Sequence, residues 1–416
     1  MELEVKIMKP ARHYRGSLNA PASKSYAQRA IAIASQTKGE CLLFNLSDSR
    51  DVRAALALAA SLGAVVKQQG MQTAINGTRQ LNNSNLHAGE AGLSIRMFAP
   101  IAALYDEPID INGCGTLLSR PLHLPEKVFE EHGVTIETNH GLLPVKIKGP
   151  MTGGTFRIDG SQSSQLLTGL LIALPLIKED STVIVQDLKS IPYIDMTMDV
   201  VRHFGVHIYQ EYYKVFHVPG AQEYQPNNYQ VEGDWSGAAF HLVAAAIGGE
   251  IELSGLNKHS AQADRAILQA IEAAGAHVSW KNDLLHVEKA QLNGFVFDAT
   301  HCPDLFPPLA NLAAQCNGES VIKGATRLIY KESNRATVIR DVWQRLGINV
   351  RLAGDEMFIT GGAIRGGSVD SFQDHRIAMM EAVASIHASA PVIIRHPMAI
   401  EKSYPLFYND FEKLSS

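Results

Sequence analysis

The sequence has few cysteines and no long uninterrupted apolar run. Its four cysteines, Cys41, Cys114, Cys302 and Cys316, form no CxxC pair and show no regular spacing. This argues against a disulfide framework and a zinc site, and is typical of a reducing compartment. The most apolar stretch, residues 166–177, contains glycine and proline and is too short to span a bilayer. The amino terminus lacks an apolar core of signal-peptide length, so we expect a cytoplasmic protein.

Charge is also modest. Asp, Glu, Lys and Arg make up 19% of the 416 residues, and the formal net charge is −5. A general affinity for nucleic acid or for an anionic membrane is therefore not expected, and any anion site must be a local cluster of Lys and Arg. The apolar fraction of 46% is ordinary for a globular enzyme, and the length suggests two or three domains.

A pattern of about 70 residues recurs five times along the chain. Each copy is an amphipathic helix that ends in glycine and is followed by a short strand rich in β-branched residues. Glycine just past a helix end adopts the left-handed cap conformation without a steric penalty. The five glycines are Gly63, Gly133, Gly205, Gly275 and Gly347.

A second series of helices, in phase with the first, is apolar around most of its circumference. Such helices are buried, whereas the first series, which carries a charged face, should be half exposed. The second series begins near Lys24, Gly92, Ser163, Ser236, Asp304 and Asp374. We predict six units in two groups of three, with helices inside and sheets outside. A linear solenoid is the alternative, although solenoid repeats usually run about 20–50 residues.

The first turns of the predicted buried helices are unusually polar. Helix amino termini bind phosphate or carboxylate, although Ser and Asp there also serve as caps. Arg is rarely buried unless it is paired with a structural carboxylate or an anionic ligand. The cations that recur at about the same position within the repeat are Lys24, Arg29, Arg96, Arg120, Lys331, Arg335, Arg376 and Lys402. Together they predict a small substrate with several negative charges.

Two carboxylates accompany these cations. Glu332 lies between Lys331 and Arg335 in the sequence, which should favour its charged form, although a solvated ion pair is the alternative. Asp304 precedes an apolar helix, where helix capping is the alternative. Paired acids beside cations could share proton transfer, with one giving and one taking.

The ordered motifs resemble those of the enolpyruvyl transferases, in particular the branch that acts on shikimate 3-phosphate. The resemblance runs from PASKSYAQRA near residue 21 to EKSYPLFYNDFEKL at the end, and includes SSQ, KESNR and QDHR between them. It implies an inside-out α/β fold of two similar domains, each with three βαβαββ-type units. Residues 1–20 and 232–416 would form one domain and 21–231 the other, with the active site in the cleft between them.

The resemblance also implies a reaction. The enolpyruvyl group of phosphoenolpyruvate would pass to the 5-hydroxyl of shikimate 3-phosphate, with release of phosphate, through a tetrahedral intermediate. The step belongs to aromatic amino acid biosynthesis and needs no metal or other cofactor. The expected partners are these two small molecules, without nucleic acid or membrane, and the chain is expected to be a monomer.

Individual residue roles follow from the same resemblance. Asp304 would take the proton of the 5-hydroxyl, and Glu332, with or without Lys24, would protonate the methylene carbon. The residues that would hold shikimate 3-phosphate are Lys24, Ser25, Arg29, Ser163, Ser164, Gln165, Ser190, Tyr193, Asp304, Arg327 and Lys331. Those that would hold phosphoenolpyruvate are Lys24, Gly92, Arg120, Gln165, Arg335, Arg376 and Lys402.

One segment departs from the family pattern. GEAGL stands at residues 89–93, where a frequent family form is GNAGT, and it places Glu90 near the expected anion pocket.

Two alternatives stay open. The sister branch, which acts on UDP-N-acetylglucosamine, has a reactive cysteine ahead of an Arg-Pro pair. Here Cys114 precedes Arg120 and Pro121 but lies one residue out of step, and the absence of a nearby His in the sequence favours an inert thiol. A non-catalytic repeat scaffold would explain the period but not the gathering of cations and acids at helix starts.

Overall fold

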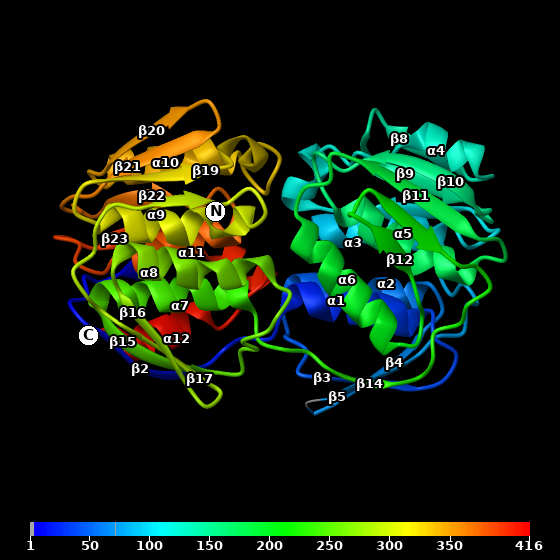
Figure 1. The fold of residues 1–416 in the computed structure, drawn as a ribbon, viewed down its shortest axis with the longest axis horizontal. Coiled ribbons are helices and arrows are strands. Elements are labelled where there is room, and N and C mark those ends of the chain that lie inside the picture. The colour runs from blue at the N-terminus through cyan, green and yellow to red at the C-terminus, as the bar shows by residue number, and fades with distance from the viewer. Residues whose placement is uncertain (1–3, 71) are drawn as a thin grey trace. The chain divides into compact units, whose positions relative to one another are not determined.

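In a computed structural model that describes residues 4–70 and 72–416, the chain forms two compact units (Figure 1). One unit contains Met1–Pro21 and Glu232–Ser416, and the other contains Ala22–Val231. The first unit is therefore built from two separate stretches of the chain.

Three apolar helices form the centre of the Ala22–Val231 unit, and α3 packs along α5. They are α1 (Lys24–Ser35), α3 (Gly92–Ala102) and α5 (Gln165–Ala173). From the second residue of each helix to the last, nearly every side chain is buried. Helices buried on all sides need a cover of other elements, which the sheets and the outer helices provide. The outer helices are α2 (Arg50–Ser61), α4 (Glu126–Glu131) and α6 (Ile191–His203).

Three four-stranded sheets surround these helices, with the strand orders β14-β3-β5-β4, β6-β7-β9-β8 and β10-β11-β13-β12. In each sheet the first pair of strands is parallel and the other pairs are antiparallel. The strands are β3 (Cys41–Phe44), β4 (Val65–Gln69), β5 (Gln72–Asn76), β6 (Asn85–His87), β7 (Ile109–Asn112), β8 (Thr135–Asn139), β9 (Leu142–Lys148), β10 (Gly154–Asp159), β11 (Ser181–Gln186), β12 (Tyr209–Glu211), β13 (Val215–Val218) and β14 (Asn228–Gln230).

The other unit repeats this plan. Figure 1 shows its three apolar helices in the middle, with sheets on opposite sides of them. These helices are α7 (Trp235–Gly248), α9 (Phe306–Ala314) and α11 (His375–Val383). The outer helices are α8 (Ile267–Ala274), α10 (Arg335–Arg345) and α12 (Phe407–Leu414).

The sheets of this unit have the strand orders β16-β17-β15-β2, β18-β19-β21-β20 and β1-β23-β22. The strands are β1 (Val5–Met8), β2 (Tyr14–Asn19), β15 (Gly249–Ser254), β16 (His277–Lys281), β17 (Leu284–Glu288), β18 (Val296–Asp298), β19 (Glu319–Lys323), β20 (Asn349–Ala353), β21 (Glu356–Thr360), β22 (Gly367–Asp370) and β23 (Val392–Arg395). The short 3₁₀ helices of the chain are η1 (Gly115–Ser119), η2 (Leu174–Leu176), η3 (Ala263–Ala266), η4 (Pro303–Leu305), η5 (Ala325–Leu328) and η6 (Pro397–Lys402).

The predicted inside-out α/β fold with six repeats is confirmed, and the solenoid alternative is wrong. All five repeat glycines have positive φ, between 79° for Gly133 and 106° for Gly63, as a left-handed cap requires. The buried helices begin within two residues of their predicted starts. Where a helix begins later than predicted, polar residues such as Ser163 and Asp374 lie just outside it and accept hydrogen bonds from its first turn.

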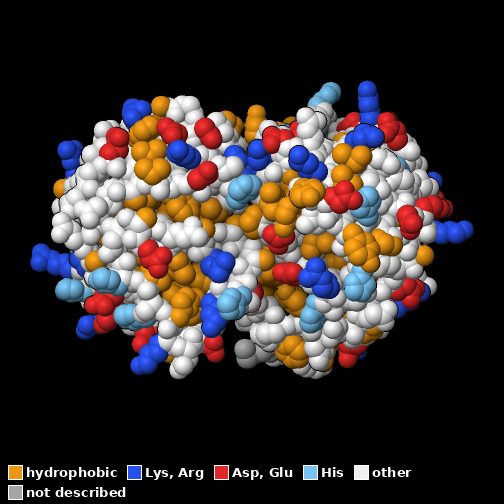
Figure 2. All heavy atoms as spheres, viewed as in Figure 1, with side chains coloured by type: hydrophobic (Ala, Val, Ile, Leu, Met, Phe, Trp, Pro, Cys, Tyr) orange, Lys and Arg blue, Asp and Glu red, His pale blue; other side chains and the backbone are white. Residues whose placement is uncertain are grey.

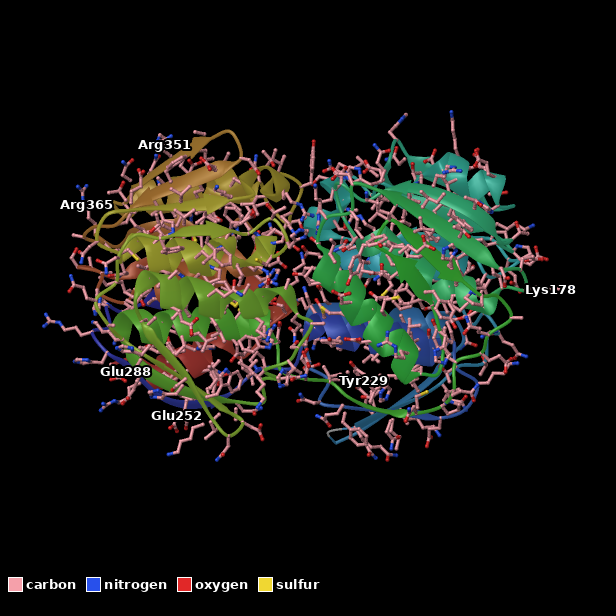
Figure 3. The ribbon with its side chains drawn as sticks, viewed as in Figure 1. Lys178, Tyr229, Glu252, Glu288, Arg351 and Arg365 are labelled. Carbon is pink, nitrogen blue, oxygen red and sulfur yellow. The ribbon has the colours of Figure 1, made fainter. Side chains whose placement is uncertain are left out.

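On one face of the molecule, surface charges of both signs lie side by side. On the face shown in Figure 2, basic and acidic side chains are interspersed. Figure 3 shows labelled charged side chains such as Lys178, Glu288 and Arg365 projecting outward from the secondary structure. The cations considered below are mostly buried ones, such as Arg29, Arg335 and Arg376. Among the described residues, no helix is both long and apolar enough to cross a bilayer.

One buried acid lies outside the set of predicted site residues. Glu381 lies on α11 with 0% of its surface exposed, and neither carboxylate oxygen has a hydrogen-bond partner among the described residues. Burial raises the pKa of this carboxyl well above its usual value, and the Asp370 carboxylate raises it further. The unfolded chain releases this proton at a lower pH than the folded chain. Stability is therefore lost as the pH rises above the ordinary glutamate pKa of about 4.3.

We expect Glu381→Met to stabilise the protein at pH 8 by about 1–3 kcal/mol, because it removes an unsatisfied buried polar group while keeping a side chain of similar length. The gain should shrink at pH 5, where the native acid is protonated more easily. Calorimetric melting of the parent and the variant at both pH values measures this. Glu272→Met, at an exposed position on α8, is the matched control. An unchanged or lower melting temperature for Glu381→Met at pH 8 would contradict the prediction.

Candidate functional site

The amino end of α1 places Lys24 beside an acid. Lys24 is the first residue of the helix, and its Nζ lies 2.8 Å from Asp51 Oδ2. The side chains are only 15% and 5% exposed, so solvent screens the pair weakly. Asp51, in the first turn of α2, therefore orients the Lys24 ammonium. Sequence reasoning assigned Asp51 no role, because an acid in a helix's first turn is common for capping reasons alone.

Arg29 connects three helices from the second turn of α1. Its guanidinium donates to Thr197 Oγ1 at 2.9 Å, to the Tyr193 carbonyl at 3.0 Å and to the Ser25 carbonyl at 2.8 Å. A longer bond of 3.5 Å reaches Thr168 on α5. Burial lowers the pKa of Arg29 to about 10, so the group stays protonated at neutral pH. Arg29 therefore holds Ser25 and Tyr193, two further predicted site residues, close to a buried positive charge.

The amino end of α3 carries two more arginines. Arg96 donates to the carbonyls of Leu122 at 2.8 Å and Pro121 at 2.6 Å, and to Gln165 Oε1 at 2.8 Å. Gly92 lies close to both guanidinium groups, because a Cβ atom at this position would lie 2.8 Å from Arg120 Nη2 and 3.0 Å from Arg96 Nη1. A glycine, two guanidinium groups and a helix amino end together form a strongly anion-attracting corner.

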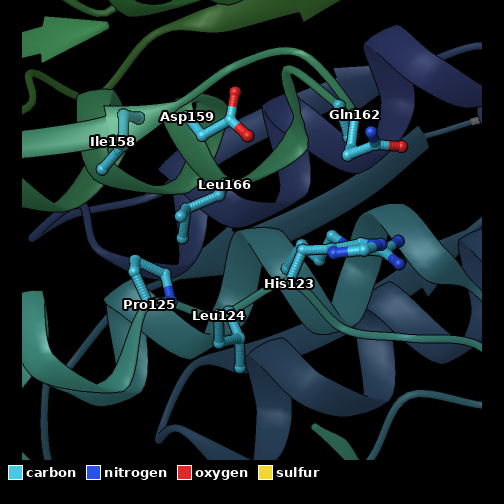
Figure 4. Close-up of a pocket in the computed structure, with 9 residues that line it drawn as sticks. His123, Leu124, Pro125, Ile158, Asp159, Gln162 and Leu166 are labelled. Atoms are coloured by element: carbon cyan, nitrogen blue, oxygen red, sulfur yellow. The ribbon is translucent and has the colours of Figure 1, made fainter. Parts of the chain in front are cut away.

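Three serines lie at the starts of α5 and α6. Ser163 Oγ accepts a hydrogen bond from the Gln165 amide at 3.1 Å, and Ser164 is buried at the helix start. Ser190 precedes α6 with φ of 57°, a left-handed conformation that costs a non-glycine residue energy and is enriched at ligand sites. Ser163 also lines a pocket of about 270 Å³ with Arg96 and His123 (Figure 4).

In the other unit, Arg335 is the centre of a charge cluster. It is the first residue of α10, and its side chain is 0% exposed. Its nitrogens lie 2.8 Å from Asp304 Oδ1, 2.7 Å from Glu332 Oε2 and 2.9 Å from Asp374 Oδ2. Burial alone would lower the pKa of this guanidinium, but the three carboxylates outweigh burial and raise it. Arg335 is therefore permanently charged.

Asp304 faces two further cations. Arg376 Nη2 lies 3.0 Å from Asp304 Oδ2, and Lys331 Nζ lies 3.5 Å from Oδ1. Burial tends to raise the pKa of Asp304, but Arg376, Lys331 and Arg335 together hold it well below its usual value. Asp304 does not cap α9, whose capping residue is Leu305. In this arrangement Asp304 is a carboxylate, but a weak base.

The cluster contains two acids that sequence reasoning did not place in the site. Asp374 accepts two hydrogen bonds from Arg335 and one from the Arg376 amide, and so connects α10 with α11. Asp264 accepts a hydrogen bond from the Ser236 hydroxyl, and burial followed by the Asp304 charge raises its pKa to about 7. The DHR motif contains Asp374, but no signal in the sequence marked Asp264.

The predicted site residues thus fall into two groups, each inside one unit. The Ala22–Val231 unit contains Lys24, Ser25, Arg29, Gly92, Arg120, Ser163, Ser164, Gln165, Ser190 and Tyr193. The other unit contains Asp304, Arg327, Lys331, Glu332, Arg335, Arg376 and Lys402. Of the second group, Arg327 donates to the Thr300 carbonyl at 2.6 Å, and Lys402 is buried at the end of η6.

Comparison with known proteins decides the family. The sequence profile described as EPSP synthase (3-phosphoshikimate 1-carboxyvinyltransferase) matches residues 8–411. The chain belongs to this family. The 3-phosphoshikimate 1-carboxyvinyltransferase of Clostridium perfringens strain SM101 is 39% identical over 407 residues, which are 96% of each chain. That of Clostridium novyi is 35% identical over 412 residues, covering 96% of this chain and 95% of the relative.

Solved structures show the same fold. An EPSP synthase from Acinetobacter baumannii matches with a TM-score of 0.84 at 24% identity, covering 99% of this chain and 98% of the other. The enolpyruvyl transferase NikO from Streptomyces tendae matches with a TM-score of 0.79 at 16% identity, covering 99% and 97%. The predicted family, and with it an enolpyruvyl transferase activity, is confirmed by the family match and the curated relatives.

Proposed function

We propose that the two groups of residues bind the two substrates of the family's reaction. The chain transfers the enolpyruvyl group of phosphoenolpyruvate to the 5-hydroxyl of shikimate 3-phosphate and releases phosphate. The observation that carries the site proposal is the gathering of Lys331, Arg335 and Arg376 around Asp304 in a protein of net charge −5. Each cation pairs with a carboxylate here, but Lys331 and Arg376 offer donors that a small ligand carrying both phosphate and carboxylate can take over.

Each substrate has its own set of residues in this proposal. Shikimate 3-phosphate contacts the serines at the starts of α5 and α6, together with Lys24, Arg29 and Tyr193. Phosphoenolpyruvate contacts the corner at Gly92 and Arg120, and also Arg335, Arg376 and Lys402. Each substrate thus draws on its own set of residues, and the two sets come from both units of the chain.

Substrate binding changes the strength of the base. The cations of the Asp304 cluster already have carboxylate partners, so an entering phosphate or carboxylate competes with Asp304 for Lys331 and Arg376. As these contacts pass to the substrate, the charges that depress the pKa of Asp304 weaken, and its pKa rises toward that of a useful base. Asp304 then becomes able to take the 5-hydroxyl proton when the substrate is in place.

The chemistry then follows in two stages. The 5-hydroxyl oxygen forms a bond to the phosphate-bearing carbon, Asp304 takes its proton, and Glu332 with Lys24 supplies a proton to the methylene carbon. The result is a tetrahedral intermediate, whose charges the surrounding arginines and lysines stabilise. In the second stage the carbon–oxygen bond to phosphate breaks, the methyl group returns a proton to the acid that gave it, and phosphate leaves with the proton that Asp304 releases.

We propose that the enzyme works as a monomer in the cytoplasm. All proposed site residues come from one chain, and the cysteines form no CxxC pair and show no regular spacing, as a reducing compartment favours.

A phosphate-release assay tests the function. Phosphate should appear with phosphoenolpyruvate and shikimate 3-phosphate, but not when UDP-N-acetylglucosamine replaces the second substrate. A thiol-blocking reagent should leave the rate unchanged, although Cys114 is exposed, because no proposed step uses a thiol. Phosphate release with the UDP-sugar, together with stoichiometric inactivation at Cys114, would support the sister activity instead.

A further inference from the structure

Two loops of the Ala22–Val231 unit are hydrogen-bonded to each other. One is the segment 88–91 before α3, and the other is the segment 112–116 that enters η1. The Cys114 amide donates to the Gly89 carbonyl at 2.9 Å, and the Ala88 amide donates to the Asn112 carbonyl at 2.8 Å. The loop that departs from the family pattern is therefore attached to the loop that leads to Arg120.

The Glu90 side chain adds a further contact between these two loops. Its Oε2 accepts hydrogen bonds from the Thr116 amide at 3.3 Å and from the Thr116 hydroxyl at 3.2 Å. Gly115 has φ of +56°, and a Cβ atom at Gly115 would lie 2.3 Å from the Glu90 carboxyl carbon. The carboxylate thus lies directly against the backbone at the start of η1.

The same short helix ends at Arg120. The Arg120 amide donates to the Leu117 carbonyl at 3.2 Å, so its backbone continues the turn of η1. The Arg120 guanidinium lies against Gly92, two residues after Glu90. The segment 115–120 is therefore held at its start by Glu90 and packs at its end against the amino end of α3.

We propose that Glu90 is a positioning residue that holds η1 so that the Arg120 guanidinium stays at the amino end of α3. The inference rests on the proposed binding of phosphoenolpyruvate at Gly92 and Arg120. Glu90 acts through Thr116 and does not itself contact the substrate. Its negative charge opposes anion binding, whereas its hydrogen bonds favour it by fixing Arg120.

Because the charge of Glu90 and its hydrogen bonds have opposite effects on phosphoenolpyruvate binding, two substitutions of Glu90 should change the KM in opposite directions. Glu90→Ala removes the acceptor, so the KM for phosphoenolpyruvate should rise about tenfold, as expected for one or two lost hydrogen bonds. Glu90→Gln keeps an acceptor and removes the charge, so its KM should equal or fall below that of the parent. In both variants kcat and the KM for shikimate 3-phosphate should change less than about twofold, because the lost contact orders only the Arg120 side of the site.

Thr116→Val tests the same hydrogen bond from the Thr116 side. It removes the hydroxyl that donates to Glu90 and keeps the shape of the side chain. It should raise the KM for phosphoenolpyruvate less than Glu90→Ala, because the Thr116 amide remains. In the double variant Glu90→Ala/Thr116→Val, the effects should not add, because both changes remove the same contact. Glu107→Ala, at an exposed position in the same unit, is the matched control and should match the parent.

Arg120→Ala separates failure of this inference from failure of the proposed site. If Arg120→Ala raises the KM for phosphoenolpyruvate but Glu90→Ala and Thr116→Val do not, the positioning role is wrong and the site stands. If Arg120→Ala leaves that KM unchanged, phosphoenolpyruvate does not bind at Arg120 and both fail. Equal rises in the KM of both substrates for Glu90→Ala would show general loosening and would also overturn the inference. Should Glu90→Ala not fold, Thr116→Val and Glu90→Gln carry the test.

Discussion

Asp304→Asn should lower kcat by about 10²–10⁴-fold, the usual contribution of a general base. The amide keeps the size of the side chain but cannot take the 5-hydroxyl proton. Binding should behave differently, because the substitution removes a negative charge that competes with phosphoenolpyruvate for Lys331 and Arg376. The Kd for phosphoenolpyruvate should therefore stay the same or fall. Stopped-flow turnover and ligand titration on one preparation measure both quantities.

The kcat of Asp304→Asn is to be compared with that of two further variants, one at the other proposed catalytic acid and one at an exposed acid. Glu332→Gln should also slow turnover and retain phosphoenolpyruvate binding, because it removes the proton donor and leaves the cations in place. Asp341→Asn alters an acid that is 57% exposed on α10 and should leave kcat unchanged. A near-normal kcat for Asp304→Asn would refute the proposed base. A lower melting temperature with normal turnover would identify Asp304 as a purely structural ion-pair partner.

Arg335→Leu should destabilise the protein by about 3–5 kcal/mol, because it leaves three carboxylates without the buried cation they share. For a unit of this size, that corresponds to a fall in melting temperature of about 6–20 °C. The deficit should be larger at pH 8 than at pH 5. Without Arg335, the pKa of the buried Asp304 carboxyl rises in the folded state, so the variant loses stability as the pH rises. Thermal melting at both pH values measures the effect.

Arg345→Leu is the matched control, at an exposed position on the same helix, and should change the melting temperature little. Adding Asp374→Asn to Arg335→Leu should recover part of the lost stability, because it removes one of the uncompensated charges. If Arg335→Leu melts like the parent at pH 8, the carboxylates are stabilised by other groups, and Arg335 is not the centre of the cluster.

Periodicity determined the fold from sequence alone. The repeat of glycines and apolar helices predicted six units, because a helix without a polar face must be buried and a glycine at a helix end marks a left-handed cap. The same periodicity placed Lys24, Gly92 and Asp304 at helix starts. Helix burial and helix capping depend on residues that are close in the sequence, so both can be predicted from the sequence alone.

The sequence also predicted which residue types the site would contain. Buried cations beside acids predicted a polyanionic substrate, and the ordered motifs predicted the family. Neither of these two predictions required knowledge of the contacts between side chains. Ser163, Ser190 and Arg335 could thus be named before any contact was known.

Only the tertiary structure decided the pairings. Asp374 and Asp304 are 70 residues apart, yet both contact Arg335, because α9, α10 and α11 bring their starts together. The pKa of Asp304 depends on these contacts, since burial and three cations act on it in opposite directions. The direction of the Glu90 carboxylate was likewise decided by the fold, which places Thr116 and Gly115 beside it. Charge interactions and hydrogen bonds act over a few ångströms in space, and sequence separation does not determine those distances.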